Sequence, residues 1–198
     1  MKHEEISFHT KKALAEALKD AMKSKPFHKI TVSELIQQCN VNRKTFYYHF
    51  EDIYALLKWM LEQEAIEVVK KFDLFVDYED AIIFIMDYIE ENDYIINCAY
   101  DSIGRDGLKL FFCADFLEIT ISIIEQAEDI TGKKMASTYK DFLSHFYMEA
   151  IAGMLIDWIK DRSQRNKNDI INYISNTIRY SLIGILQSLP DDNGFTET

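Results

Sequence analysis

The sequence predicts an all-α protein with an N-terminal three-helix unit and a larger C-terminal helical domain. Three observations support this prediction. The 198 residues include only two Pro and six Gly, so few residues interrupt helices. Apolar residues recur at intervals of three and four along most of the chain, which is the spacing of one buried helix face. Hydrophobic residues make up 48% of the chain, enough to form a substantial core.

The first predicted helix spans residues 7–24. Apolar residues at helical spacing form its buried face, and four lysines occupy the other faces. The segment SKPFHK ends this helix, because Pro26 disfavours helical backbone at the residue before it. The apolar face consists of Leu14, Ala17, Leu18, Ala21 and Met22.

Two short helices joined by a tight turn are predicted next. Thr31 is a candidate N-cap, and Glu34 three residues later completes a capping box. Asn40 fits the end of this helix because Asn tolerates left-handed backbone. Asn42 is the candidate N-cap of a second short helix that ends near His49. This order of elements predicts a helix-turn-helix.

The rest of the chain predicts one helix after another, with a turn or kink at the segment GRDG. Helices are expected at residues 79–91, 93–103, 108–131, 136–162 and 168–187. The predicted domains are a helix-turn-helix domain at 7–51, a connecting helix at 52–76, a C-terminal regulatory and dimerisation domain at 77–189, and a flexible tail at 190–198.

Charge is unevenly distributed along the chain. Residues 1–60 carry a net charge of +3 and residues 61–198 a net charge of −14. An acidic body is repelled by phosphate, so nucleic acid would contact only the first part. Three widely spaced cysteines form neither a zinc pattern nor a disulfide framework. With no secretory signal and no membrane-spanning run, the sequence predicts a cytoplasmic protein without a membrane partner.

The second short helix combines residue types that bind DNA. In a helix-turn-helix the second helix enters the major groove N-terminus first, so its first turn meets base edges. Basic side chains can bind guanine, and Thr can contact a base. Hydroxyl and imidazole groups near its far end, and at the start of the preceding helix, can reach phosphates. The predicted DNA-binding residues are Thr31, Asn42, Arg43, Lys44, Thr45, Tyr47, Tyr48 and His49. Phe46 and Phe50 are predicted to be core.

The stretch ITVSELIQQCNVNRKTFYYHFEDIYALLKWM resembles the DNA-binding domain of the TetR (TetR/AcrR) family of bacterial transcriptional regulators. The resemblance implies a repressor-like homodimer on a palindromic double-stranded DNA operator, with a larger C-terminal domain for ligand binding and dimerisation. Asn40 stands where the family often has Gly, and Glu51 and Asp52 stand near the place of a frequent Lys. The matching residues are Thr31, Val41, Thr45, Phe46, Tyr48, His49 and Phe50.

Two interpretations of the C-terminal domain stay open. In the first, the domain encloses a small apolar effector. The candidate pocket residues are Phe112, Phe116, Phe146, Tyr147 and Trp158, each of which could instead be ordinary core. In the second, the acidic domain answers to a protein partner. The N-terminal segment is similar to regulators of dihydroxyacetone utilisation within the TetR family, which take their signal from a protein. From the sequence we predict a repressor released by a small-molecule effector, with the protein-responsive regulator as the alternative.

The last two apolar helices are candidates for a dimer interface. YMEAIAGMLIDWI and IINYISNTIRYSLIGIL are strongly apolar, and Gly153 and Gly184 would allow helices to approach closely. Two such helices from each subunit would form a four-helix interface, the arrangement that the family uses. The alternative is that both helices are buried within one subunit. The candidate interface residues are Met154, Trp158, Ile178, Leu182 and Ile185.

Motifs of enzymes are missing from the sequence. It contains no HExxH, GxSxG, Walker or GxGxxG motif. His145 and Glu149 are four residues apart and could share a metal, but no further ligands lie nearby in the sequence. We therefore predict no catalytic residues, no metal and no cofactor.

Overall fold

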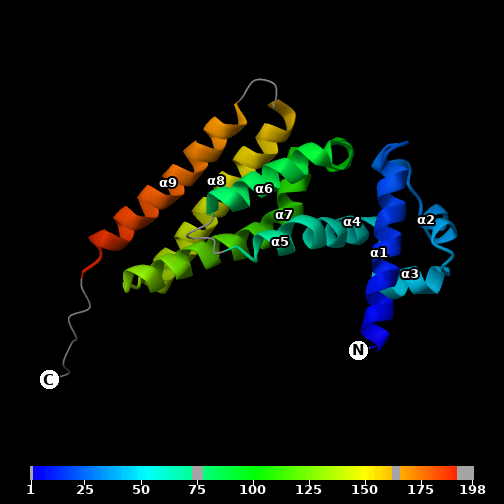
Figure 1. Cartoon of the computed structure of the whole chain (residues 1–198), viewed down its shortest axis with the longest axis horizontal. Helices are drawn as coiled ribbons and strands as arrows, with labels where there is room; N and C mark the ends of the chain where they lie inside the picture. Colours follow the sequence, from blue (N-terminus) through cyan, green and yellow to red (C-terminus); the bar gives the residue numbers. More distant parts are fainter. Residues whose placement is uncertain (1, 73–77, 162–165, 191–198) are drawn as a thin grey trace. The chain divides into compact units, whose positions relative to one another are not determined.

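The computed structural model describes residues 2–72, 78–161 and 166–190 (Figure 1). It confirms the predicted all-α fold, and the described residues contain no strand. The helices are α1 (Lys2–Met22), η1 (Phe27–Lys29), α2 (Val32–Gln38), α3 (Arg43–His49), α4 (Ile53–Leu61), η2 (Glu62–Ile66), α5 (Glu67–Val69), α6 (Tyr78–Glu91), α7 (Asp93–Thr131), α8 (Ser137–Asp161) and α9 (Lys167–Ser188).

The chain divides into two compact units. The first unit combines Met1–Val68 with Tyr88–Leu108, and the second combines Val69–Asp87 with Lys109–Thr198. The predicted domain boundaries stay a proposal, and these units cross them. The predicted tail, residues 190–198, lies outside the described residues except for Pro190.

The first unit is built around the apolar face of α1. Leu14 and Leu18 of α1 are fully buried, as are Leu35 of α2 and Phe46 of α3. α1 begins at Lys2, earlier than the predicted start at residue 7. Because these helices bury apolar side chains against one another, the helix-turn-helix is supported by a single small core.

The helical run through α4, η2 and α5 contains one wide turn. The amide of Glu67 donates to the carbonyl of Glu62, five residues earlier, which is the spacing of a π-helical turn. Glu64 lies in this turn and contacts two other elements of the first unit. Its carboxylate pairs with Lys19 of α1 and accepts a 2.9 Å hydrogen bond from the Tyr88 hydroxyl of α6.

Residues 88–108 are joined to the first unit by further contacts. The Cys98 thiol donates to the carbonyl of Lys25 at 3.8 Å, and the ammonium of Lys23 lies 5.9 Å from the centre of the Tyr94 ring. The predicted kink in GRDG is confirmed at Gly104, whose φ of 70° and ψ of 178° interrupt the helical backbone of α7. Gly104 has a left-handed φ that residues with a Cβ rarely adopt.

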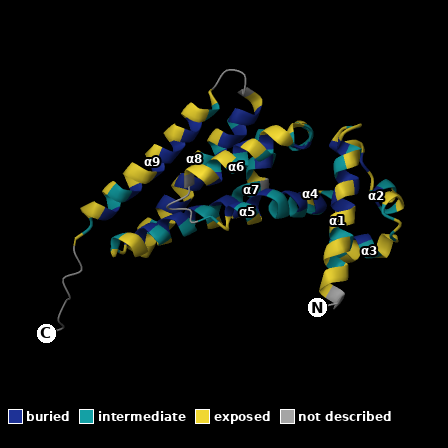
Figure 2. Cartoon of the chain, in the orientation of Figure 1, coloured by how far each residue is buried: buried dark blue, intermediate teal, exposed yellow. Residues whose placement is uncertain are grey.

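The second unit holds the later part of α7 together with α8 and α9. In α9, buried and exposed positions recur along the helix (Figure 2). Glu128 of α7 is fully buried, and its carboxylate forms an ion pair with Lys140 at 2.7 Å and accepts a hydrogen bond from the Met135 amide at 2.9 Å. This carboxylate fixes the turn after Gly132, whose φ of 68° ends α7 where the sequence predicts it. No helix in the described part of the chain is long and apolar enough to cross a membrane.

Candidate nucleic-acid interface

The two caps predicted for the helix-turn-helix are present. The Thr31 hydroxyl accepts a hydrogen bond from the Glu34 amide at 3.4 Å at the start of α2. Burial would raise the pKa of the Glu34 carboxyl, but hydrogen bonds from Lys25 and from the Thr31 backbone outweigh it and lower that pKa. The turn between the helices passes through Asn40, whose φ of 52° is left-handed as expected.

α3 begins with a well-formed cap. The Asn42 side-chain oxygen accepts hydrogen bonds from the Thr45 amide at 2.8 Å and from the Thr45 hydroxyl at 3.1 Å. The Thr45 hydroxyl proton is therefore engaged within the protein. This cap fixes the first turn of α3 before any ligand is bound.

Buried aromatic residues fix the inner side of α3. Phe46 is fully buried and Phe50 is 5% exposed, which confirms their predicted core role. On the opposite side, Tyr47 and Tyr48 are exposed, and the guanidinium of Arg43 lies 5.8 Å from the centre of the Tyr47 ring. The helix thus presents polar and basic groups to solvent from a fixed apolar base.

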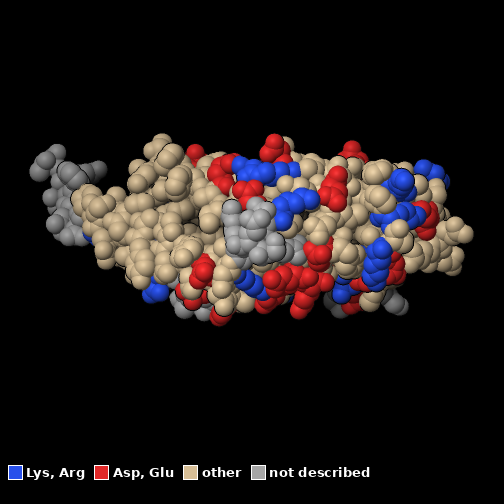
Figure 3. Space-filling model, turned by 90° about the horizontal axis from the view of Figure 1, so that it is seen from above, with Lys and Arg blue, Asp and Glu red and all other residues tan. Residues whose placement is uncertain are grey.

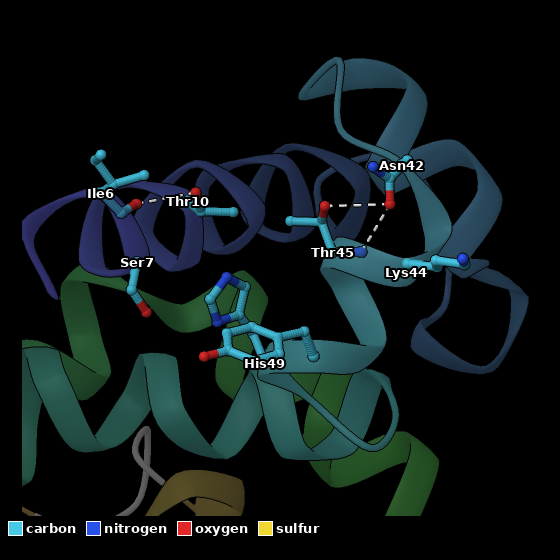
Figure 4. Close-up of a pocket in the computed structure, with 8 residues that line it drawn as sticks. Ile6, Ser7, Thr10, Asn42, Lys44, Thr45 and His49 are labelled. Carbon is cyan, nitrogen blue, oxygen red and sulfur yellow. Dashed lines mark hydrogen bonds between the residues drawn. The ribbon is translucent and has the colours of Figure 1, made fainter. Parts of the chain in front are cut away.

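An open groove of about 480 Å³ lies between α1 and α3 (Figure 4). It brings together five of the eight predicted DNA-binding residues. It also includes three residues of α1 that the sequence did not predict. Which side of α1 faces α3 depends on tertiary packing, and local sequence spacing does not reveal it. The lining residues are Ile6, Ser7, Thr10, Asn42, Lys44, Thr45, Tyr48 and His49. Thr31, Arg43 and Tyr47 do not line it.

The acidic residues after α3 have separate positions. The Asp52 carboxylate caps α4 by accepting a 2.8 Å hydrogen bond from the Ala55 amide. Glu51 is exposed and does not line the groove. Asp52 therefore has a structural role that accounts for its presence so close to α3.

On the face of the molecule seen in Figure 3, basic and acidic side chains lie beside one another instead of forming one continuous basic surface. The groove differs from this pattern, because its eight lining residues include Lys44 and His49 and no carboxylate. The local charge therefore favours an anion at the groove.

The C-terminal pocket residues are dispersed. The second unit has an apolar cavity of about 60 Å³, and of the five predicted residues only Phe116 lines it. Tyr147 is buried and shares a 2.8 Å hydrogen bond with Ser181 of α9, and Trp158 is fully buried. Phe112 is partly buried, whereas Phe146 is 55% exposed and so cannot line an enclosed pocket of one chain. The cavity is lined by Val69, Ala81, Ile82, Ile85, Phe116, Ile119, Ile123, Ile151, Leu155 and Ile178.

The predicted interface residues also separate by burial. Trp158, Ile178 and Leu182 are buried within one chain, so they belong to its core and leave little side-chain surface for a second copy to contact. Met154 is 38% exposed and Ile185 is partly exposed, so both remain available. The large apolar side chains that α8 and α9 expose are Tyr139, Phe142, Phe146, Met154, Tyr173 and Tyr180.

Two family patterns match the chain. Residues 14–60 match "Bacterial regulatory proteins, tetR family", and residues 77–180 match "Transcriptional regulator C-terminal region", which covers more than half of the chain. The chain belongs to the TetR family. The first match contains the whole helix-turn-helix, from the middle of α1 to α4. As a TetR-family transcriptional regulator, the chain has DNA as the partner that the family implies.

Relatives within the TetR family include a regulator of a named operon. The chain is 24% identical over 148 residues to the HTH-type dhaKLM operon transcriptional activator DhaS of Lactococcus lactis subsp. lactis (strain IL1403), which covers 75% of this chain and 78% of the relative. A solved structure described as the dihydroxyacetone kinase operon activator DhaS shares its fold, with a TM-score of 0.63 and 22% identity over 90% of this chain and 96% of that chain.

Proposed function

We propose that this protein is a homodimeric transcription regulator of the cytoplasm that binds a palindromic DNA operator with α3 in the major groove. The observation that carries this proposal is the exposed side of α3, which holds Arg43, Lys44 and two tyrosines on a helix fixed by a cap and a buried Phe46. A rigid basic helix of this kind matches the recognition helix of a helix-turn-helix.

Each exposed group has a role that follows from its chemistry. Arg43 and Lys44 lie in the first turn and would bind guanine edges, and the Thr45 methyl would contact thymine. Tyr47, Tyr48 and His49 would donate to phosphates beside the groove. The oxygen of Thr31 accepts from Glu34, which leaves its proton for another phosphate.

Dimerisation is supported by the exposed faces of α8 and α9. Tyr139, Phe142 and Phe146 form a row of stacked rings with centroids 6.4 and 6.2 Å apart. A Cβ added at Gly184 of α9 would meet no atom within 4 Å, so a second helix has room to approach there. Exposed apolar faces of this kind mark protein interfaces. A second copy of the chain is the occupant that two operator half-sites require.

For the effector, the cavity favours a protein partner over a small molecule. Pockets for small molecules enclose about 300–1,000 Å³. The apolar cavity of the second unit holds only about 60 Å³ and offers no polar group to orient a ligand. We therefore place the protein-responsive regulator ahead of the small-molecule-responsive one.

The sign of regulation that we propose is supported by the name of a relative. DhaS of Lactococcus lactis is named a transcriptional activator of the dhaKLM operon. We carry activation over to this chain in place of the repression that the family resemblance implies, and genes for dihydroxyacetone kinase are the first candidate target. Loss of the protein should then lower transcription of its target, whereas higher transcription would indicate a repressor.

Selection from a random pool of double-stranded DNA tests the proposal. The full-length protein should enrich an inverted repeat whose half-sites are about one helical turn, or a multiple of it, apart. Enrichment of no sequence would contradict DNA binding, and enrichment of a single asymmetric site would contradict the dimer. Affinity capture from cell extract should then recover a protein partner, while a small molecule that alone releases or recruits DNA would reverse our choice of effector.

A further inference from the structure

The start of α1 lies outside the family's DNA-binding pattern. The helix begins at Lys2, whereas the match to the family begins at residue 14. The groove beside α3 nevertheless includes Ile6, Ser7 and Thr10 from these earlier turns. No role in DNA binding is assigned to them by the family match or by our sequence analysis.

These turns are fixed to the rest of the first unit by aromatic contacts. The Phe8 ring meets the Trp59 ring of α4 edge to face, with centroids 5.9 Å apart. The Lys12 ammonium lies 5.1 Å from the centre of the Phe8 ring, and the Lys11 ammonium lies 5.6 Å from that of Trp59. Contacts of both kinds are attractive. The beginning of α1 is thus a fixed wall of the groove.

Ser7 provides the unused hydrogen-bond donor of this wall. The Thr10 hydroxyl donates to the carbonyl of Ile6 at 3.0 Å, which occupies its proton. Ser7 is partly buried, and its hydroxyl has no hydrogen-bond partner among the described residues. Ser7 and His49 lie on facing walls of the groove, as Figure 4 shows. The Ser7 hydroxyl and the His49 imidazole therefore face the same open space, whereas the Lys44 side chain, which also lines the groove, extends away from them (Figure 4).

We propose that Ser7, together with Tyr48 and His49, binds a phosphate of the operator backbone beside the half-site that α3 reads. The inference rests on the proposed DNA-binding function. Hydroxyl and imidazole donors are typical phosphate contacts, and backbone contacts fix the register of a recognition helix. Glu4 and Glu5 are exposed and do not line the groove, so no carboxylate is among the residues around the proposed phosphate position.

Two substitutions at Ser7 and one matched control test this assignment. Ser7→Ala removes only the hydroxyl and should weaken binding of the selected DNA duplex by about tenfold. Ser7→Glu adds a carboxylate that faces the phosphate and should weaken it by about a hundredfold or more. His9→Glu adds a carboxylate on the same turn of α1, at an exposed residue that does not line the groove, and should bind nearly as the wild type.

Fluorescence anisotropy at about 50 mM and about 200 mM salt supplies a second readout. The gap between Ser7→Glu and Ser7→Ala should narrow at the higher salt, because screening weakens the added repulsion. Equal affinity of Ser7→Glu and His9→Glu for DNA would overturn the Ser7 assignment and leave the proposed function standing. If the wild type selects no DNA, the proposed function fails. Circular dichroism melting checks that each variant is folded.

Discussion

The solvent side of α3 and the solvent sides of α8 and α9 expose opposite kinds of chemistry. α3 exposes basic, hydroxyl and imidazole groups to solvent. Phe46 within the helix and Phe50 at its C-cap are both buried. α8 exposes Phe142 at 60% and Phe146 at 55%, while it buries Trp158 and Tyr147. Both surfaces are fixed by a buried aromatic base, yet one is suited to phosphate and the other to apolar surface.

This difference indicates two partners of different class. Exposed cations that have no carboxylate beside them favour a polyanion. A row of exposed aromatic rings costs free energy in water and is stabilised when another protein covers it. Both regions bury aromatic side chains, so the chemistry of the exposed side chains distinguishes the surface proposed for DNA from the surface proposed for a second subunit.

The largest effect is expected at the DNA surface. Arg43→Ala combined with Lys44→Ala removes the two cations of the first turn of α3 in both half-sites. Each bidentate base contact contributes about 1–3 kcal/mol, so the affinity for the selected duplex should fall by at least about a hundredfold. Fluorescence anisotropy measures this loss.

A control with the same change of charge separates local contact from net charge. Lys71→Ala combined with Lys160→Ala removes two exposed lysines of the second unit. This variant should retain DNA affinity within a few-fold. If the two double variants lost affinity equally, α3 would not be the recognition helix.

The apolar surface is tested by Phe142→Glu combined with Phe146→Glu. Burying a Phe contributes about 1.5–3 kcal/mol, so this variant should raise the dissociation constant of the dimer by more than about a hundredfold. Analytical ultracentrifugation should find a monomer where the wild type is a dimer. Unfolding of the monomer should change little, because both rings are exposed within one chain.

The matched control places two carboxylates at exposed apolar residues of α7. Leu110 is 77% exposed and Ile130 is 60% exposed, and neither belongs to α8 or α9. Leu110→Glu with Ile130→Glu should stay dimeric. A monomeric wild type, or a dimer that persists after both substitutions in α8, would contradict the proposal that this apolar surface binds a second copy of the chain.

The two surfaces also differ in how far the sequence predicted them. The caps at Thr31 and Asn42 act within three residues, and the left-handed turn needs only Asn40, so local spacing was sufficient to predict α3 and its outward side. The bounds of α6, α8 and α9 were also predicted to within one residue, whereas the two helices predicted at 93–103 and 108–131 form one helix, α7, with a kink at Gly104.

The inward and outward sides of α8 could not be predicted in the same way. Its segment from Ser137 to Asp161 carries apolar residues around the whole helix, so no single stripe identifies the buried side. Trp158 became core and Phe146 became surface because of packing between distant segments. Ser7 was not predicted for a related reason. Its position opposite α3 depends on the contact between Phe8 of α1 and Trp59 of α4, which are distant in the sequence.

A smaller effect is expected at Glu128 of α7, which is buried and pairs with Lys140 near the start of α8. Glu128→Gln removes the charge that pairs with Lys140 and should lower the free energy of unfolding by about 2 kcal/mol. Glu125→Gln is the control: this residue is 56% exposed and 3.9 Å from the same lysine, and its change should cost less than about 0.5 kcal/mol. Urea unfolding compares the two.

The pH dependence gives an independent check on Glu128. Burial would raise its pKa, but hydrogen bonds and the charges of Lys140 and Lys134 outweigh burial and lower it. The carboxylate therefore stabilises the fold fully above the pKa of the unfolded chain, and this contribution is lost as pH falls through the lower, folded pKa. The difference between wild type and Glu128→Gln should be largest near neutral pH and shrink in acid. A difference that grows in acid would contradict the ion pair.

The smallest expected effect tests where the boundary between the two compact units lies. Residues 88–108 fall within the match to the C-terminal family pattern, yet they form a compact unit with the DNA-binding helices. Tyr88 donates to Glu64 at 2.9 Å, and burial together with the Glu64 charge raises the pKa of Tyr88, so the phenol keeps its proton. Tyr88→Phe should cost about 1 kcal/mol, whereas Tyr54→Phe, at a tyrosine that is 41% exposed, should cost less.

Native-state hydrogen exchange locates the loss from Tyr88→Phe. Because Glu64 also pairs with Lys19, release of the Tyr88 hydrogen bond should speed exchange in α1 and α4. Amides of α8 and α9 should be unchanged, since these helices belong to the other unit. Faster exchange in α8 and α9 alone would assign Tyr88 to the C-terminal unit. Residues 88–108 would then no longer be part of the first unit, and the boundary between the two units would lie at the end of the π-helical turn.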